Sequence, residues 1–209
     1  LHLCDRRQRQ MCIRDSHNTV KRFANFKKAV EEDACGRAAD VQKEIQFVLE
    51  REQLAHTLVD LQDAGKLPLR VTHNDTKLNN IMIDNATHKG ICVIDLDTVM
   101  PGLSLNDFGD SIRFGASTGA EDEKDLSRIS CDMELYDIYA KGFVEGCGGA
   151  LTDMEIECLP IGAKVMTYEC GMRFLTDYLS GDTYFKVDYP THNLDRTRTQ
   201  LKLVWDMEQ

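Results

Sequence analysis

The sequence lacks two features that would each point to a particular class of protein. No apolar run approaches the roughly 20 residues that a membrane-spanning helix needs. None of the cysteines forms a C-x-x-C pair, and the eight are scattered at Cys4, Cys12, Cys35, Cys92, Cys131, Cys147, Cys158 and Cys170. Disulfide scaffolds are short, secreted and dense in cysteine, so we expect idle or buried thiols in a reducing cytosol. The protein is therefore predicted to be cytoplasmic, without a membrane partner.

Positive charge is also scarce. Lys and Arg total 25 against 35 Asp and Glu, which gives a formal net charge of −10. Such a surface repels nucleic-acid phosphates and anionic membranes, so neither is an expected partner. A nucleotide site in this chain would need local positive charge or metal ions to overcome that field.

The length and composition fit one well-buried globular domain, with 42% hydrophobic and 29% charged residues. Residues 1–16 (LHLCDRRQRQMCIRDS) show neither helical nor strand periodicity and look unrelated to the rest of the chain. We interpret them as a non-native or disordered leader. Residues 17–209 are then expected to form the folded part.

Helical periodicity dominates that folded part. Apolar residues recur at spacings of three and four from Phe23 to Leu61, in a segment that also holds the first glycine, Gly36. After Gly102 the pattern is helical again to the end of the chain. Within it, Thr152 and Glu155 predict a capping box. The long helix after residue 160 is expected to end near residue 179. The last helix is expected to begin near residue 191.

Three short apolar runs interrupt the helices and predict strands. They lie at residues 69–72, 80–83 and 90–94. The last two flank a polar turn, so they predict a hairpin. The expected fold class is α+β, mainly α, with a small central β-hairpin layer.

The segment that carries chemistry begins where the first predicted strand ends. It reads HNDTKLNN, from His73 to Asn80, and the hairpin after it ends on Asp95. Phosphoryl transfer needs a carboxylate near the attacking hydroxyl and oxygen ligands that hold Mg²⁺ against the phosphates. Mg²⁺ usually takes only one or two protein carboxylates. A loop that offers Asp75 and Asn80, facing a strand end that offers Asp95, supplies these parts.

This arrangement is the H-x-D-x-x-x-x-N pattern of kinase catalytic loops. The segments THNDTKLNN, CVIDLDTVMPG, FGDSIRF and MRFLTDYLSGDTYFK resemble the aminoglycoside-phosphotransferase-like superfamily. Within it they are most similar to bacterial N-acetylhexosamine 1-kinases, which phosphorylate the anomeric hydroxyl of N-acetylglucosamine and N-acetylgalactosamine. The resemblance covers about residue 17 to the end. It implies the C-terminal lobe of a protein-kinase-like fold, ATP and Mg²⁺ as cofactors, and a sugar as the small-molecule partner.

The resemblance also implies roles for particular residues. Asp75 would be the catalytic base, and Lys77 would contact the transferring phosphate. Asn80 and Asp95 would bind Mg²⁺ and with it the nucleotide, and Asp97 would hold a second metal or cap the next turn. Arg173 and Tyr184 would contact the sugar together with Asp75, while His73 would hold the loop through its imidazole.

Several of these residues have simpler interpretations. Asp75 and Asn80 are also common turn formers. Arg173 has Glu169 four residues before it and Asp177 four residues after it, which equally predicts an exposed ladder of ion pairs. Asp107 and Asp110 are expected to brace the catalytic loop or cap a helix rather than contact substrate.

Two parts of the kinase pattern are not found in the first 70 residues. These are a glycine-rich loop that covers the phosphates and a strand lysine that pairs with them. Lys21, Lys27 and Lys28 lie in helical or irregular sequence. We interpret the chain as an N-terminally truncated fragment and expect it to be inactive by itself, although its full-length parent would be active.

Three other functions remain open. The chain could act on an aminoglycoside, choline, homoserine or a methylthio-sugar, and a strongly acidic pocket would favour a cationic acceptor. Asp95 and Asp97 form a D-x-D, which metal-dependent glycosyltransferases use, although such domains place several parallel strands before it. The fragment could also be a non-catalytic binding remnant.

Overall fold

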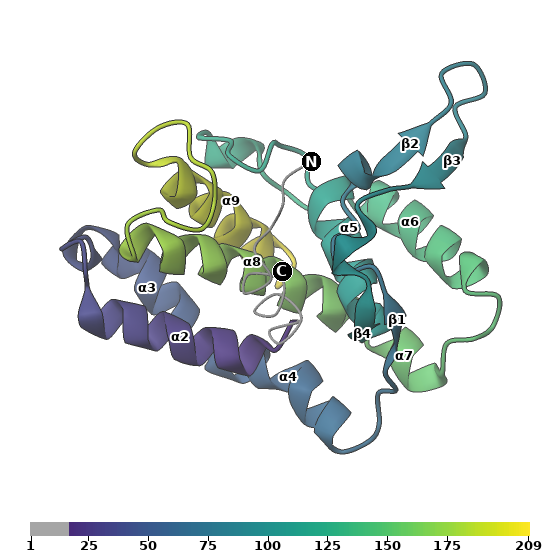
Figure 1. Cartoon of the computed structure of the whole chain (residues 1–209), viewed down its shortest axis with the longest axis horizontal. Coiled ribbons are helices and arrows are strands. Elements are labelled where there is room, and N and C mark those ends of the chain that lie inside the picture. The colour runs from purple at the N-terminus through teal and green to yellow at the C-terminus, as the bar shows by residue number, and fades with distance from the viewer. Residues whose placement is uncertain (1–16) are drawn as a thin grey trace.

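A computed structural model describes residues 17–209, so the predicted leader lies outside the described residues. The described part is mainly helical and contains four short strands (Figure 1). Its α-helices are α2 (Thr19–Glu32), α3 (Gln42–Leu49), α4 (Glu52–Asp63), α5 (Ser104–Gly115), α6 (Met133–Gly146), α7 (Asp153–Glu157), α8 (Leu159–Leu179) and α9 (His192–Asp206). Its strands are β1 (Arg70–Thr72), β2 (Ile81–Ile83), β3 (Gly90–Val93) and β4 (Met100–Gly102). The expected α+β class is confirmed at this level.

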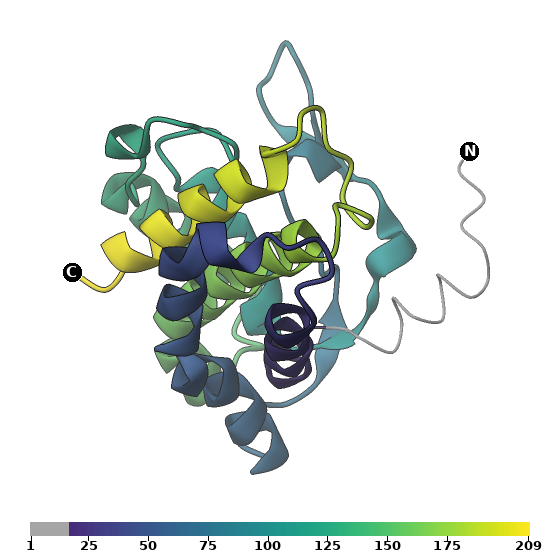
Figure 2. The ribbon, with the colours of Figure 1, turned by 90° about the vertical axis from the view of Figure 1, so that its left-hand side faces the viewer.

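Helix α8 runs through the middle of the molecule and packs against α9, α5 and α2 (Figures 1 and 2). Its apolar residues at spacings of three and four are fully buried, with the exposed fraction of Tyr168, Met172, Leu175 and Leu179 at 0%. The Tyr168 hydroxyl donates to the carbonyl of Val48 at 2.9 Å, so the buried phenol keeps a partner. The predicted end of this helix near residue 179 is confirmed.

Helices α5 and α8 approach each other closely because glycine lies at their crossing. A Cβ atom built on Gly109 would collide with the backbone carbonyl of Gly162 and would lie 2.7 Å from Cγ of Met166. A Cβ atom on Gly162 would in turn lie 3.0 Å from the carbonyl oxygen of Leu105. Only hydrogen fits at Gly109 without moving a main chain. This contact sets the depth at which α5 sits against the central helix.

The strands form two separate antiparallel pairs. The predicted hairpin is β2 with β3, in which Ile81 faces Val93, and it projects away from the helices (Figures 1 and 2). The first predicted strand, β1, pairs with β4, so that Val71 faces Pro101. Strand β4 was not predicted, because Met100–Gly102 contains a proline and a glycine and resembles a turn. Both pairs in residues 17–209 are antiparallel, which argues against the glycosyltransferase topology.

Two details of the helical pattern are wrong. The chain does not stay helical after Gly102: residues 116–132 form an irregular segment with one short 3₁₀ turn, Leu126–Arg128, and a bridge between Ser117 and Cys131. Gly36 lies in a turn after α2, with φ of +65°, and not inside a helix. In residues 116–132 the backbone N–H of Thr118 donates to the carbonyl of Ser130, and the backbone N–H of Ser130 donates to the hydroxyl of Thr118. These backbone groups are therefore paired without helical hydrogen bonds.

Two further local predictions are confirmed, the capping box and the start of the last helix. Thr152 and Glu155 form the capping box at the start of α7, and Pro160 lies in the first turn of α8. Thr191 is the N-cap of α9. Cys35, Cys92, Cys131, Cys147, Cys158 and Cys170 are all free, while Cys4 and Cys12 lie outside the described residues. Within residues 17–209 no helix combines the length and the apolar character that a membrane crossing requires.

Glu155 links the start of α7 to β1 and α5. Its side chain is 1% exposed. It accepts two hydrogen bonds from Arg70, at 2.7 and 2.6 Å, and one from the hydroxyl of Ser104 at 2.7 Å. It also accepts from the backbone N–H of Thr152 at 2.8 Å. The hydrogen bonds from Arg70 are the main reason that the pKa of Glu155 is lowered, to about 2. Burial alone would raise this pKa.

Replacing Glu155 by Gln is expected to lower the free energy of unfolding by about 3 kcal/mol, because a buried, fully bonded carboxylate is lost and Arg70 is left without its partner. Since the pKa is depressed in the folded state, this stabilisation is present above about pH 4.5 and is lost as the pH falls towards 2. Urea denaturation at pH 7 and pH 3 measures both effects. Glu157→Gln, an exposed change on the same helix, is the control, with an expected change within about 0.5 kcal/mol. Equal losses in the two variants would contradict the assignment.

Candidate active site

The loop after β1 is fixed by the side chain of its second residue. Asn74 has φ of +63°, a left-handed conformation that asparagine tolerates better than most residues. Its amide nitrogen donates to the carbonyls of Thr72, at 3.2 Å, and Thr98, at 3.0 Å. Its amide oxygen accepts from the hydroxyl of Thr72 at 2.9 Å. The backbone therefore turns sharply just before Asp75 and is held there.

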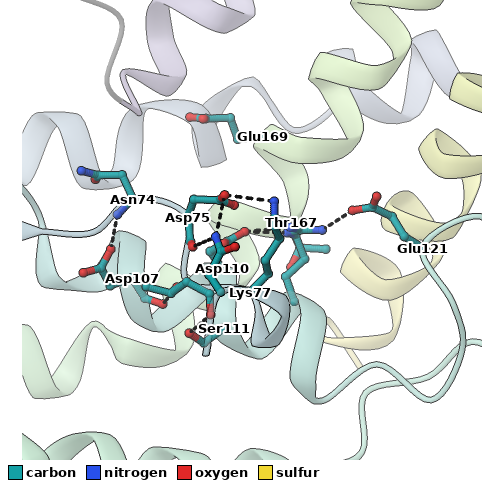
Figure 3. Close-up of polar contacts among 12 residues, drawn as sticks. Asn74, Asp75, Lys77, Asp107, Asp110, Ser111, Glu121, Thr167 and Glu169 are labelled. Atoms are coloured by element: carbon teal, nitrogen blue, oxygen red, sulfur yellow. Dashed lines mark hydrogen bonds and ion pairs between the residues drawn. The ribbon is translucent and has the colours of Figure 1, made fainter. Parts of the chain in front are cut away.

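Asp107, in the first turn of α5, braces the same loop. Its carboxylate accepts from the backbone N–H of His73 at 2.8 Å. It also accepts from the backbone N–H of Asn74 at 2.7 Å (Figure 3). Its carbonyl accepts from the hydroxyl of Thr76 at 2.6 Å. Burial raises the pKa of Asp107, while the two N–H groups oppose that rise. These contacts agree with the prediction that Asp107 braces the loop and does not contact the substrate.

Asp75, Lys77 and Asn80 come together as the sequence pattern predicts. The amide nitrogen of Asn80 donates to the carbonyl of Asp75, at 2.8 Å, and to its carboxylate, at 2.9 Å. The ammonium group of Lys77 lies 3.0 Å from the same carboxylate oxygen (Figure 3). Because both partners of the Asn80 amide nitrogen are acceptors, its amide oxygen is the group that remains to bind a cation. These contacts exceed those of a simple turn.

His73 joins the loop to the end of the hairpin, as expected. One ring nitrogen lies 2.9 Å from the carbonyl of Ile94, and the backbone N–H of Ile94 donates to the carbonyl of Asn80 at 2.9 Å. The next residue, Asp95, therefore lies beside the loop, in a left-handed conformation with φ of +60°. Asp95 and Asp97 are both exposed, and neither lines the cavity that contains Asp75. Asp97 lies inside the 3₁₀ turn Leu96–Thr98 and not at its N-cap, which is Asp95.

The oxygen atoms of Asn80 and Asp95 fit a magnesium ion by their chemistry. They are hard donors, one neutral and one anionic, on segments joined by the Ile94–Asn80 hydrogen bond. In the described part of the chain no three His, Cys, Asp or Glu side chains gather as a metal cage. Two protein ligands are what Mg²⁺ commonly takes when phosphates complete its shell.

Asp75 and Lys77 open into a cavity of about 510 Å³. The cavity walls come from the segment before α2, the catalytic loop, α5, the irregular segment after α5, α8, the loop before α9 and the start of α9. Apart from His17, its charged residues are five cations and four carboxylates: Lys77, Arg113, Arg173, Lys186 and Arg196, against Asp75, Asp110, Glu121 and Glu169. The cavity is therefore close to electrically balanced, although the chain as a whole carries −10. It does not have the acidic character that would favour a cationic acceptor.

Arg173 and Tyr184 both line this cavity, as the predicted sugar contacts should. The guanidinium carbon of Arg173 lies 5.7 Å from the ring centroid of Tyr184 and 5.3 Å from that of Phe185. The ion-pair ladder is not found among the described residues. Glu169 is bonded to His17 and Thr19 instead, and Asp177 accepts from the backbone N–H groups of Thr183, Tyr184 and Phe185.

Several cavity residues were not identified from the sequence. Arg113 is buried and donates to Asp110, at 2.8 and 3.0 Å, and to Glu121, at 2.6 Å. The spacing of Asp110 and Arg113 was a usable signal for that ion pair. His17 and Glu169 are 152 residues apart and carried no such signal. Their contact exists only because α2 packs against α8.

A comparison with known protein families gives a match. The family model described as APH, phosphotransferase enzyme family, matches residues 1–140. The matched part contains the whole catalytic loop and the predicted metal ligands Asn80, Asp95 and Asp97. Arg173 and Tyr184 lie beyond it, so the match supports the phosphotransfer chemistry and leaves the acceptor open.

Proposed function

This chain belongs to the phosphotransferase enzyme family, and from that premise we propose that it carries the catalytic lobe of an ATP- and Mg²⁺-dependent sugar kinase. The proposed acceptor is the anomeric hydroxyl of N-acetylglucosamine or N-acetylgalactosamine. The observation that carries the proposal is the contact of Asp75 with both Lys77 and Asn80 at the mouth of a nearly neutral cavity. We propose that the protein acts in the cytoplasm and has no nucleic-acid partner.

The proposed chemistry assigns one task to each residue of the loop. Asp75 accepts the proton of the attacking hydroxyl or orients it, as a carboxylate at the cavity wall can do. Lys77 neutralises charge on the moving phosphoryl group. Its ammonium group lies 3.0 Å from Asp75 and hence beside the hydroxyl that attacks the phosphorus. Asp107 and His73 keep the loop fixed, so little reorganisation is needed during transfer.

Asn80 and Asp95 are the proposed ligands of Mg²⁺, with Asp97 available for a second ion. When bound, the ion would supply positive charge to the phosphates of ATP. The chain's own contribution is to hold the two oxygen donors on neighbouring segments. The hydrogen bonds of Ile94 to Asn80 and to His73 do this.

The shape and charge of the cavity favour an uncharged sugar. Its volume is within the roughly 300–1,000 Å³ of small-molecule sites. Arg173 offers N–H donors for hydroxyl or acetamido oxygens, and Tyr184 and Phe185 offer apolar ring faces. Five cations against four carboxylates would oppose binding of a polycationic aminoglycoside or of choline.

We further propose that the 209-residue chain gives no measurable turnover by itself. Within residues 17–209 no strand carries a lysine, and Lys21, Lys27 and Lys28 all lie on α2. The described part therefore offers neither the strand lysine nor a glycine-rich cover for the phosphates. These contacts would have to come from elsewhere in the active enzyme.

An acceptor screen tests the proposal. The native gene product is incubated with Mg²⁺-ATP and either an N-acetylhexosamine, an aminoglycoside, choline, homoserine or a methylthio-sugar, and ³¹P NMR identifies the product. We expect a sugar 1-phosphate and the highest kcat/KM for N-acetylhexosamines. A preference for a cationic acceptor would contradict the proposed substrate. The same assay on the 209-residue chain is expected to give no product, and a phosphorylated sugar there would overturn the proposed inactivity.

A further inference from the structure

The peptide unit between Asn74 and Asp75 is held by two histidines, one on each side. Its N–H, which belongs to Asp75, donates to Nδ1 of His73 at 3.3 Å. Its carbonyl, which belongs to Asn74, lies 3.3 Å from Nε2 of His17. The plane of this peptide sets the direction in which the Cα atom of Asp75 presents its carboxylate. Groups that hold the plane therefore act on the proposed catalytic base.

The neutral form of His73 satisfies both of its contacts. Nδ1 accepts the N–H of Asp75, so the ring proton is on Nε2. That nitrogen lies 2.9 Å from the carbonyl of Ile94, to which it donates. No additional proton is needed on this side of the peptide.

His17 is in a different position, because both of its partners are acceptors. Nδ1 lies 3.0 Å from a carboxylate oxygen of Glu169, and Nε2 lies 3.3 Å from the carbonyl of Asn74. A neutral imidazole has one N–H and cannot donate to both. The two contacts are complete only in the imidazolium, which carries an N–H on each nitrogen.

The surroundings of His17 favour that charged form. Glu169 is 1% exposed, its other oxygen accepts from the hydroxyl of Thr19 at 2.7 Å, and Arg22 lies 3.3 Å away. Burial would raise the pKa of Glu169, but the bond and charge of His17, with Arg22, lower it to about 2. Burial likewise opposes charge on His17, but the bond to Glu169 raises the pKa of His17 above its ordinary value.

The charged and titratable groups around His17 come from each element packed against it. They are Glu169 and Arg173 on α8, Arg22 on α2, Asp107 on α5, and His73 and Asp75 in the catalytic loop. The carboxylates among these groups favour the imidazolium, and Arg173 opposes it. Glu169 makes the direct contact and so has the largest favourable effect.

We propose that His17 is a positioning residue that, as the imidazolium, holds the Asn74 carbonyl and so orients Asp75. The inference rests on the proposed role of Asp75. The bridge is complete at low pH and is lost as the pH rises through the pKa of His17, because one N–H must then serve two acceptors. The remaining N–H of His17 then donates to Glu169, because a charged carboxylate is the stronger acceptor. The Asn74 carbonyl loses its donor.

NMR of the 209-residue chain tests the bridge without any need for turnover. Two-bond ¹H–¹⁵N spectra are expected to show His17 mainly as the imidazolium, with both nitrogens protonated, at pH 6.5, which is about the ordinary pKa of histidine. The backbone amide signal of Asp75 is expected to move with the same midpoint as His17. Glu169→Gln should lower that midpoint, and His17→Gln should remove the movement. His56→Gln, at a partly exposed histidine on α4, is the matched control and should leave it unchanged.

Turnover by the native gene product supplies the second readout. His17→Gln is expected to lower kcat by about 10-fold to 100-fold, to leave the KM for ATP unchanged, and to abolish the fall of kcat at alkaline pH. A single protonated nitrogen on His17 at pH 6.5, or an Asp75 amide that does not follow His17, would overturn the positioning role. Should no phosphotransfer be detected, the proposed function fails, and the NMR titration still decides whether His17 controls the loop.

Discussion

Replacement of Asp75 by Asn is expected to lower kcat for phosphate transfer by about 10²–10⁴-fold in the native gene product. Asparagine keeps the size of the side chain and can still bond to Asn80, so the loop should retain its shape. It cannot accept a proton, and it no longer forms the ion pair with Lys77 that is 3.0 Å long in the wild type. The KM for the acceptor should change little, since the rest of the cavity is intact. Steady-state kinetics with the best acceptor of the screen measures both constants.

A matched change separates this effect from a general loss of charge. Asp60→Asn removes one carboxylate from the exposed surface of α4, outside the catalytic loop and outside the lining of its cavity. We expect wild-type kcat for that variant. If Asp75→Asn retained wild-type kcat while its thermal unfolding stayed unchanged, Asp75 could not be the base or the orienting group.

Replacement of Gly109 by Ala is expected to lower the free energy of unfolding by about 3 kcal/mol. The new methyl group would collide with the Gly162 carbonyl, which belongs to the main chain of α8 and cannot rotate away. Relief requires α5 to move, and α5 carries the Asp107 carboxylate that braces the loop. For a chain of this size the Tm should fall by roughly 6–12 °C. Calorimetry or circular dichroism measures the shift.

Gly142→Ala is the control, because the same substitution should have the opposite sign there. Gly142 lies inside α6, and a Cβ atom on it would meet nothing within 4 Å. Alanine is the better helix former by about 1 kcal/mol, so this variant should be more stable than the wild type. Equal effects of the two changes would show that helix propensity, and not the crossing of α5 and α8, governs position 109.

The parts of the molecule that were predictable from the sequence are those whose bonds are local. Tyr168 and Leu175 share a face of one helix, and the capping box joins residues three apart, so a periodic pattern records them. The loop from His73 to Asn80 is predictable for the same reason. Its defining contact, Asn80 to Asp75, spans five residues.

The parts that were missed depend on contacts between distant segments. Strand β4 exists because it pairs with β1, and nothing in the sequence of Met100–Gly102 favours a strand. The alternative interpretation of Arg173 paired it with its helical neighbours, but Glu169 turns towards His17 and Asp177 is occupied by the loop after α8. Tertiary packing decided each of these cases, and a local pattern could not record it.

The cavity beside Asp75 has walls from segments that are far apart in the chain, from His17 to Arg196. It therefore has no counterpart in the unfolded chain, and a compound that occupies it binds the native state alone. Binding and folding are then one linked equilibrium, in which the apparent stability rises with the logarithm of the ligand concentration. An acceptor retained through purification would add to the measured stability of every variant, so the variants should be compared at the same free acceptor concentration.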